Sequence, residues 1–152
     1  MRVLVTGGTG FVGCHTVAAL VGQGHQVRLL VRAPERIGPA LDPLGVTQLQ
    51  VVLGDVTNPT TVQQAMAGCQ AVVHAASVYS LDPRRAAVMA QTNPVGTDIV
   101  LGAAHRLGLD PIIYVSSVAV FWPTTARPAE PERFARVLTL ARRVRALAAR
   151  TT

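Results

Sequence analysis

Short apolar runs along the chain alternate with longer segments in which apolar residues recur at helical spacing. The short runs predict buried β-strands, and the helical spacing predicts helices between them. The expected strands cover residues 3–6, 26–31, 48–53, 71–75 and 111–116, and the expected helices cover residues 11–21, 59–66 and 83–107. Strands that alternate with helices through short connections are typical of right-handed βαβ units. The pattern therefore predicts an α/β fold, a doubly wound parallel sheet of about five strands in the order 3-2-1-4-5, with helices on both faces.

Several residues support the expected helix ends. Asn58 followed by Pro59 is an N-cap with proline in the first helical turn. Gly68 and Gly108 follow the second and third helices, as expected of residues that end a helix. Pro94 lies inside the third helix, where it removes one backbone hydrogen bond, so we expect a local distortion there.

The pattern changes after residue 122. Residues 123–131 are loop-like, and residues 132–150 show a separate helical pattern with an apolar face and an arginine-rich face. We therefore expect a domain at 1–122 and a basic tail at 123–152 that carries an extra C-terminal helix. Such a helix most often covers apolar surface of its own protein. The alternatives are binding to a partner or to an anionic membrane.

The composition is that of a globular protein with one domain. Of the 152 residues, 49% are hydrophobic and 14% are charged. No apolar run reaches the length of a membrane span, and the N-terminus has no signal-peptide cleavage site. Cys14 and Cys69 stand apart in apolar or helical contexts, as expected of reduced thiols. These features predict a cytoplasmic protein and argue against a membrane role.

The net charge of +6 comes from the C-terminal tail. Residues 1–126 contain seven arginines and six acidic residues, whereas residues 127–152 contain the other seven arginines and only Glu130 and Glu132. The body of the chain is therefore nearly neutral, and its basic pI does not indicate nucleic-acid binding. All 14 basic side chains are arginines, so the chain has no lysine.

The segment TGGTGFVG at residues 6–13 joins the first strand to the first helix. Gly7 allows a sharp exit from the strand, Gly10 lets the backbone approach a pyrophosphate without a Cβ, and Gly13 allows the helix to pack closely against the sheet. The N–H groups of the first helical turn then face the phosphates. A glycine-rich turn can also be a plain connector, but its place in the first βαβ unit favours dinucleotide binding.

Five segments in the same order resemble the extended short-chain dehydrogenase/reductase family, the group of NAD-dependent epimerases, dehydratases and dihydroflavonol-reductase-like enzymes. They are TGGTGFVG at 6–13, GDV at 54–56, HAAS at 74–77, NPVGT at 93–97 and YVSSVAVF at 114–121. The resemblance implies a Rossmann-type domain that binds a dinucleotide. It also implies an oxidoreductase whose full-length form acts on a small carbonyl or nucleotide-sugar substrate.

The resemblance assigns roles to individual residues. Asp55 corresponds to the family's aspartate at the adenine amino group, and Ser117 corresponds to the catalytic serine that positions the substrate carbonyl. His74 has no second residue at metal-ligand spacing, so we expect it to form hydrogen bonds and expect no metal site. The other residues of these segments that we expect at the cofactor are Gly7, Gly10, Phe11, Val12, Gly13, Val56, Ala75, Ala76, Ser77 and Ser116.

The end of the second strand distinguishes NADP from NAD. NAD-binding domains usually carry an acidic residue there, which accepts hydrogen bonds from the ribose hydroxyls. In this chain Arg32 occupies that place, with Arg36 a turn further on. A guanidinium can bind a 2′-phosphate bidentately, so we expect NADP rather than NAD as the cofactor. In the alternative interpretation, Arg32 is a solvated strand end that pairs with Glu35.

One part of the family's chemistry is missing from the chain. The family uses a tyrosine for proton transfer and a lysine four residues later that lowers the pKa of that tyrosine. Tyr79 is followed at that spacing by Pro83, and Tyr114 by Val118. We therefore expect a catalytically incomplete, C-terminally truncated member that lacks its substrate domain and exposes apolar surface prone to self-association. The alternative is a non-catalytic, NADP-sensing regulatory module.

Overall fold

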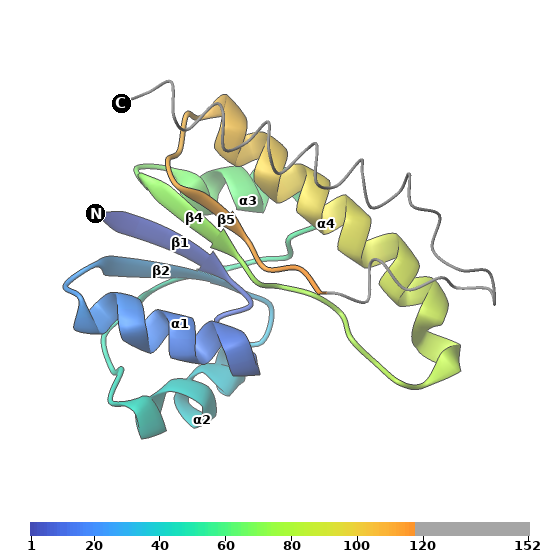
Figure 1. Cartoon of the computed structure of the whole chain (residues 1–152), viewed down its shortest axis with the longest axis horizontal. Coiled ribbons are helices and arrows are strands. Elements are labelled where there is room, and N and C mark those ends of the chain that lie inside the picture. The colour runs from blue at the N-terminus through green and yellow to red at the C-terminus, as the bar shows by residue number, and fades with distance from the viewer. Residues whose placement is uncertain (118–152) are drawn as a thin grey trace. The chain divides into compact units, whose positions relative to one another are not determined.

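Five parallel strands form one sheet in the order β3-β2-β1-β4-β5 (Figure 1). The computed structural model describes residues 1–117. The strands are β1 (Arg2–Thr6), β2 (Gln26–Val31), β3 (Gln50–Leu53), β4 (Ala71–His74) and β5 (Ile112–Tyr114). This arrangement confirms the Rossmann-type fold and the strand order that the sequence pattern predicts.

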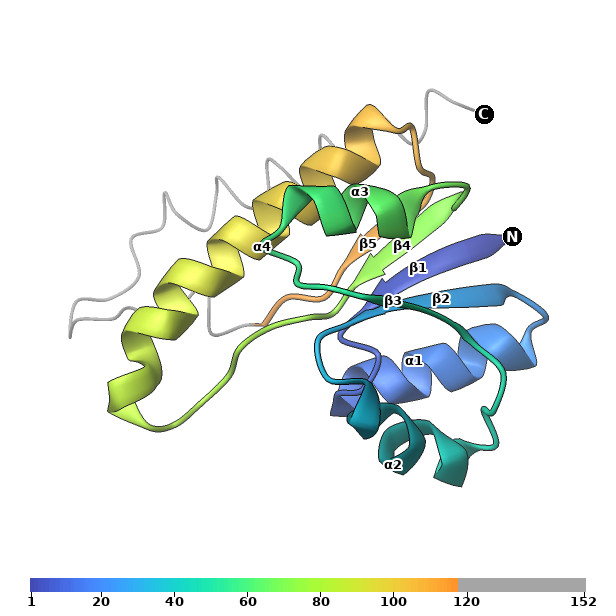
Figure 2. The same ribbon diagram turned by 180° about the vertical axis from the view of Figure 1, so that it is seen from behind.

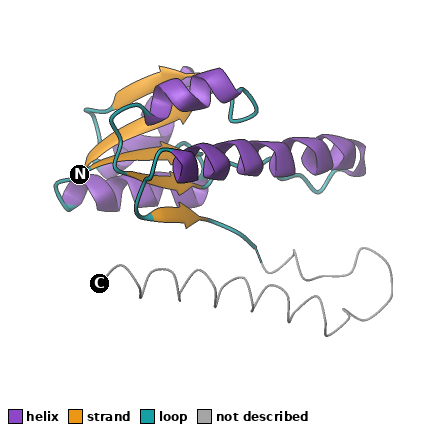
Figure 3. Cartoon of the chain, turned by 90° about the horizontal axis from the view of Figure 1, so that it is seen from above, coloured by secondary structure: helices purple, strands orange, loops and turns teal. Residues whose placement is uncertain are grey.

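Helices cover both faces of the sheet (Figures 1 and 2). One face carries α1 (Phe11–Gly22) and α2 (Ile37–Leu41), and the other carries α3 (Pro59–Met66) and α4 (Ala86–Arg106). Figure 3 shows helices in front of the strands and behind them. Within residues 1–117, no helix is long and apolar enough to span a membrane.

The two hydrophobic cores follow from the alternation of side chains along the central strands. Val3 and Val5 on β1 pack into the core beneath α1, whereas Leu4 between them packs into the core beneath α3 and α4. A central strand of a doubly wound sheet is buried on both faces, which explains why its apolar run is continuous. The first core also contains Val17, Val27, Leu29 and Leu41, and the second also contains Val62, Met66, Val72 and Val100.

Three predicted strands are shorter in the structure. The strand predicted at 48–53 begins at Gln50, where its pairing with Arg28 begins. The strand predicted at 71–75 ends at His74. The strand predicted at 111–116 is limited to Ile112–Tyr114, because these are the residues that pair with β4. In each case the predicted strand includes an apolar residue outside the paired register, namely Leu49, Ala75 and Val115.

The helix predicted at 83–107 is divided in the structure. It begins with a separate 3-10 helix, η3 (Pro83–Arg85), and α4 follows from Ala86. Asp82 caps this first turn, because its carboxylate accepts a hydrogen bond from Arg84 N at 3.0 Å. By contrast, α4 continues through Pro94, and the predicted cap of α3 is confirmed.

The segment between β2 and β3 contains helical elements that the sequence pattern did not predict. They are η1 (Pro34–Arg36), α2 and η2 (Asp42–Leu44). Its three prolines and two glycines interrupt any helical period, yet Leu41 is fully buried and packs into the first core. Tertiary packing therefore determines this short helix more than its local sequence does.

The chain divides into two units, Met1–Val115 and Ser116–Thr152. All the strands and helices given above belong to the first unit. The predicted boundary at residue 122 and the predicted C-terminal helix lie outside the described residues, so they stay predictions.

Candidate functional site

A pocket of about 260 Å³ lies at the carboxyl ends of β1, β2 and β4. The strand order reverses between β1 and β4, and open α/β sheets bind ligands at this point of reversal. The pocket brings together seven of the residues that the sequence predicts at the cofactor, namely Gly7, Gly10, Arg32, Val56, Ala75, Ala76 and Ser77. The sequence pattern did not predict Thr9, Leu30, Ala33, Val78 or Thr92 as part of this lining.

The fold requires glycine at two positions of the turn after β1. Gly7 has a φ of +72°, and a Cβ there would lie 2.6 Å from the carbonyl carbon of Ala75 and from Ala76 N. A Cβ on Gly13 would overlap the Gly7 carbonyl oxygen. Gly13 therefore allows close packing of α1 against the turn itself, whereas the sequence motif predicted close packing of the helix against the sheet.

Gly10 is a different case, because a Cβ there would need only a small shift of the turn and would not overlap it. Gly10 is exposed and lines the pocket. A Cβ added to Gly10 would meet one atom of the described residues within 4 Å, the Gly7 carbonyl oxygen at 3.3 Å. The φ of Gly10 is −90°, which is open to any residue. The space beside Gly10 is therefore free for a ligand that approaches the backbone closely.

The first turn of α1 presents backbone N–H groups at the same place. The first helical hydrogen bond runs from Cys14 N to Gly10 O at 2.8 Å, so the amides of Phe11, Val12 and Gly13 precede the helical ladder. The first turn has no acidic residue, and its dipole favours an anion. The side chains of Phe11 and Val12 do not line the pocket, so any contact from these two predicted residues is expected through the backbone.

A buried hydrogen-bond network supports the turn from below. Thr6 Oγ1 lies 2.6 Å from His74 Nδ1 and accepts a hydrogen bond from Ala76 N at 3.3 Å. His74 Nε2 lies 3.3 Å from Thr97 Oγ1. The His74 ring stacks on the Tyr114 ring, with 5.7 Å between the ring centroids. The network joins β1, β4, α4 and β5. It confirms the expectation that His74 forms hydrogen bonds, and residues 1–117 contain no cluster of three metal-ligating side chains.

The protonation state of His74 follows from its burial. The side chain is 1% exposed, and desolvation lowers the pKa of His74 from 6.5 to about 4. The ring is therefore neutral at neutral pH, and it acts in the network as one donor and one acceptor.

Asn93 fixes the loop that forms the opposite wall of the pocket. Its Oδ1 accepts a hydrogen bond from Val78 N at 2.8 Å, and its Nδ2 donates to Val78 O at 2.9 Å. This pair of hydrogen bonds ties the backbone after Ser77 to α4. The sequence contained this signal in the NPVGT segment, but only as a family likeness without a role for Asn93.

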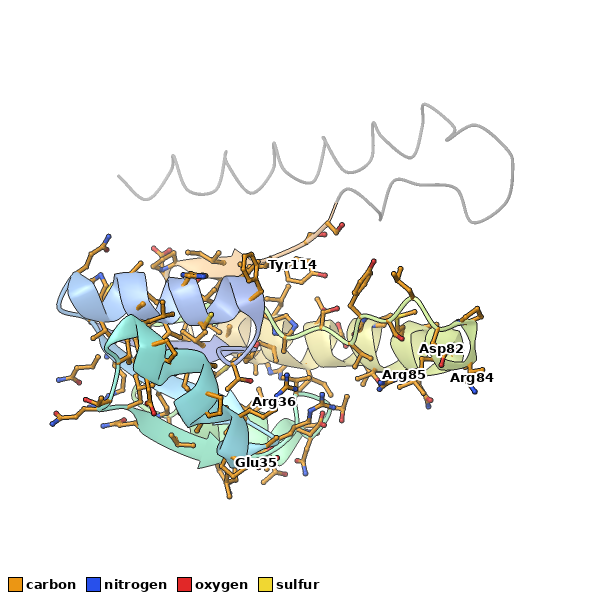
Figure 4. All side chains as sticks on the ribbon, turned by 90° about the horizontal axis from the view of Figure 1, so that it is seen from below. Glu35, Arg36, Asp82, Arg84, Arg85 and Tyr114 are labelled. Atoms are coloured by element: carbon orange, nitrogen blue, oxygen red, sulfur yellow. The ribbon has the colours of Figure 1, made fainter. Side chains whose placement is uncertain are left out.

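Two arginines lie at the β2 side of the pocket. Arg32 and Arg36 both line it, and Arg32 Nη1 lies 3.4 Å from Asp55 Oδ2. The carboxylate that Arg32 contacts is therefore Asp55, and the alternative pairing with Glu35 is wrong. Glu35 and Arg36 leave η1 in different directions (Figure 4), and Glu35 does not line the pocket.

Hydrogen bonds from Thr57 hold the carboxylate of Asp55 in place. Its Oδ1 accepts hydrogen bonds from Thr57 N at 2.8 Å and from Thr57 Oγ1 at 2.7 Å. Partial burial raises the pKa of Asp55, but the hydrogen bonds from Thr57 and the positive charge of Arg32 together bring it below the ordinary 3.8. Asp55 does not itself line the pocket, although its neighbours Gly54 and Val56 do.

The two serines predicted after the fifth strand belong to the second unit. Ser116 and Ser117 are exposed residues directly after Val115 in the chain. The pocket described above is built from the first unit alone. The expected roles of Ser116 at the cofactor and Ser117 in catalysis stay predictions.

A glycine turn, a helix N-terminus and a pocket at the switch point of a parallel sheet define the class of Rossmann-type dinucleotide-binding domains. Comparison with known families agrees. The model of the NAD dependent epimerase/dehydratase family matches residues 3–138, and the chain belongs to this family.

Individual relatives come from the same group. A Synechocystis protein named "Putative dihydroflavonol 4-reductase" is 42% identical over 115 residues, which are 76% of this chain and 32% of the relative. The 2-alkyl-3-oxoalkanoate reductase of Stenotrophomonas maltophilia is 36% identical over 124 residues, 79% of this chain and 34% of the relative. The chain thus spans about a third of the length of these relatives.

Solved structures show the same fold. A short-chain dehydrogenase/reductase superfamily protein from Agrobacterium tumefaciens, with bound NAD, superimposes with a TM-score of 0.67 and 29% identity. The match covers 86% of this chain and 40% of that protein. The chain is therefore an NAD-dependent epimerase/dehydratase-type Rossmann domain, in which a dinucleotide is the family's cofactor.

Proposed function

We propose that the pocket binds NADP(H), with the pyrophosphate against Gly10 and the first amides of α1. The free space beside Gly10 and the amides that precede Cys14 support the pyrophosphate position. When bound, the cofactor supplies or accepts a hydride. The residues of this chain bind and orient the cofactor. The pocket wall that Asn93 holds in place runs along the cofactor.

The charge of the residues that line the pocket supports NADP rather than NAD as the cofactor. Among the described residues, the lining contains two cations, Arg32 and Arg36, and no acidic side chain. An NAD-binding pocket is expected to place a carboxylate at the end of β2 for the ribose hydroxyls, whereas a 2′-phosphate is stabilised by a guanidinium. The proposal therefore assigns the 2′-phosphate to Arg32 and Arg36.

The Arg32→Asp variant is expected to lose most of the preference for NADPH. Losing a charge-assisted contact lowers affinity by about 1.5–3 kcal/mol, on the order of 10- to 100-fold for NADPH, while NADH binding changes little. Fluorescence titration with both cofactors measures this. Arg85→Asp makes the same charge change at an exposed position outside the pocket and is the control. Equal affinities of the unchanged chain for NADPH and NADH contradict the NADP proposal.

We further propose that residues 1–152 bind the cofactor without turning it over. The chain has no lysine and no tyrosine with a lysine four residues later. The reaction of a whole protein containing this domain is proposed as reduction or epimerisation of a small carbonyl or nucleotide-sugar substrate, in line with the reductase names of the relatives and the epimerase name of the family. The second candidate, an NADP-sensing module, rests on the same missing pair.

The purified chain is accordingly expected to show no carbonyl-dependent oxidation of NADPH under conditions in which titration shows it to be saturated. The physical reason is that no described side chain in the pocket can donate a proton and hold the nicotinamide ribose as the tyrosine and lysine pair does. Absorbance of NADPH with a panel of small ketones and aldehydes measures turnover. Steady oxidation with any of them contradicts the prediction.

A further inference from the structure

Arg32 forms an ion pair with Asp55, and this contact affects how Arg32 can bind an anion. The guanidinium assigned to the 2′-phosphate is already in contact with a carboxylate, at 3.4 Å. The two side chains are 62% and 34% exposed, and Arg32 lines the pocket, so a ligand there can reach the guanidinium while Asp55 stands beside it. An anion that binds Arg32 therefore meets the negative charge of Asp55 close by.

We propose that Asp55 determines cofactor specificity by competing with the 2′-phosphate for Arg32, and so limits the preference for NADPH over NADH. The inference rests on the proposed function of the pocket. A 2′-phosphate and the Asp55 carboxylate are both acceptors for the same guanidinium and repel each other. A ribose with a free 2′-hydroxyl carries no such charge, so Asp55 does not oppose NADH in this way.

The competition is enforced because Asp55 cannot readily turn away. Its Oδ1 is held by both the backbone and the hydroxyl of Thr57, which directs Oδ2 toward Arg32. The same hydrogen bonds and the Arg32 charge outweigh the effect of partial burial and keep the pKa of Asp55 low, so the carboxylate is ionised at neutral pH. A fixed negative charge therefore lies next to the first arginine of the pocket, just outside the lining itself.

Arg36 explains why a preference for the phosphate remains. The ion pairs of the described residues are Arg32 with Asp55 and Arg84 with Asp82, so Arg36 lines the pocket without a carboxylate of its own there. One neutralised and one unneutralised arginine make the lining moderately, and not strongly, selective for a doubly charged phosphate.

The Asp55→Asn variant tests this. The amide oxygen can still accept from Thr57, but the charge is lost. We expect the ratio of the dissociation constants for NADH and NADPH to rise about three- to tenfold, since nearby exposed charges interact by roughly 1 kcal/mol. A contact of residue 55 with the adenine is common to both cofactors and cancels in the ratio. Glu35→Gln removes the same charge from an exposed position outside the pocket and is expected to leave the ratio unchanged.

A double-mutant cycle separates competition from a general structural effect. In the Arg32→Gln background the Asp55→Asn change is expected to raise the ratio by a smaller factor, because competition for the guanidinium is then absent and only the direct repulsion between carboxylate and phosphate remains. If Asp55→Asn does not fold, Thr57→Val, which removes one of the two hydrogen bonds to Oδ1, is expected to raise the ratio in the same direction by a smaller factor.

The outcomes distinguish the inference from the proposal beneath it. If the unchanged chain binds neither cofactor, the proposed function is wrong. If it binds both and Asp55→Asn leaves the ratio unchanged or lowers it, the proposed function stands and the inference is overturned. A rise of the ratio that is equally large in the Arg32→Gln background also overturns it, because Asp55 then acts without Arg32.

Discussion

Replacing Gly10 with valine is expected to abolish dinucleotide binding while the sheet stays folded. The glycine has an ordinary φ, and the close atom of the described residues is the Gly7 carbonyl oxygen at 3.3 Å, so we expect a small shift of the turn to admit a side chain. The valine would occupy the space where backbone and pyrophosphate are proposed to meet, and it would lie over the amides of the first α1 turn. We expect affinity for NADPH to fall on the order of 100-fold or more, since several charge-assisted hydrogen bonds are lost together.

Two other glycines of the same helix make this test specific. Gly22 has no atom within 4 Å of its Cβ position, so Gly22→Val places the same side chain in α1 at a site remote from the pocket. This control is expected to fold and to bind NADPH normally. Gly13→Val is expected to disrupt the turn itself, because even a Cβ there overlaps the Gly7 carbonyl oxygen. Circular dichroism reports the fold and fluorescence titration reports binding. Normal affinity of a folded Gly10→Val variant shows that the turn is only a connector.

The central part of the fold is predictable because each of its signals is local. Both β1 and β4 carry apolar residues on both faces, and the glycine turn follows β1 directly. The sequence therefore predicts both the strand and the point at which it ends. The order of the strands then follows from general rules of handedness and switch points rather than from any particular contact. The glycine turn also predicted one side of the pocket for the same reason, since Gly7 and Gly10 line it.

Contacts between distant parts of the chain could not be read from the sequence. Thr6 and His74 are 68 residues apart, and Asp55 lies 23 residues from Arg32. The local pattern offered Glu35 as the nearer partner of Arg32, but the parallel register of β2 and β3 brings the residues after these strands together instead. The helix Ile37–Leu41 was missed because its stability comes from burial of Leu41 rather than from its own glycine- and proline-containing sequence.

His74 is expected to make the fold sensitive to mild acid. Burial lowers the pKa of His74 from 6.5 to about 4 in the folded chain. Below pH 6.5, the pKa of the histidine in the unfolded chain, the unfolded state binds a proton that the folded state does not. The contribution of His74 to the free energy of unfolding is therefore fully present above pH 6.5 and falls as the pH falls. A difference of this size corresponds to about 3 kcal/mol, a large fraction of the roughly 5–15 kcal/mol typical of a domain. The loss is complete near pH 4, whereas the lowered pKa of Asp55 contributes only below about 3.8.

The His74→Asn variant isolates this effect. Its side chain can still bond Thr6 but does not titrate, and it leaves Thr97 without its ring partner. We expect the free energy of unfolding at pH 8 to fall by about 1–3 kcal/mol. We also expect its slope between pH 6.5 and 4 to become flatter than that of the unchanged chain. His105→Gln removes an exposed imidazole from the end of α4 and is the control, with the steeper slope retained. Urea unfolding at several pH values measures both quantities. An unchanged slope in His74→Asn shows that other groups cause the acid sensitivity, because the buried ring between Thr6 and Thr97 is then not the site that takes up the proton.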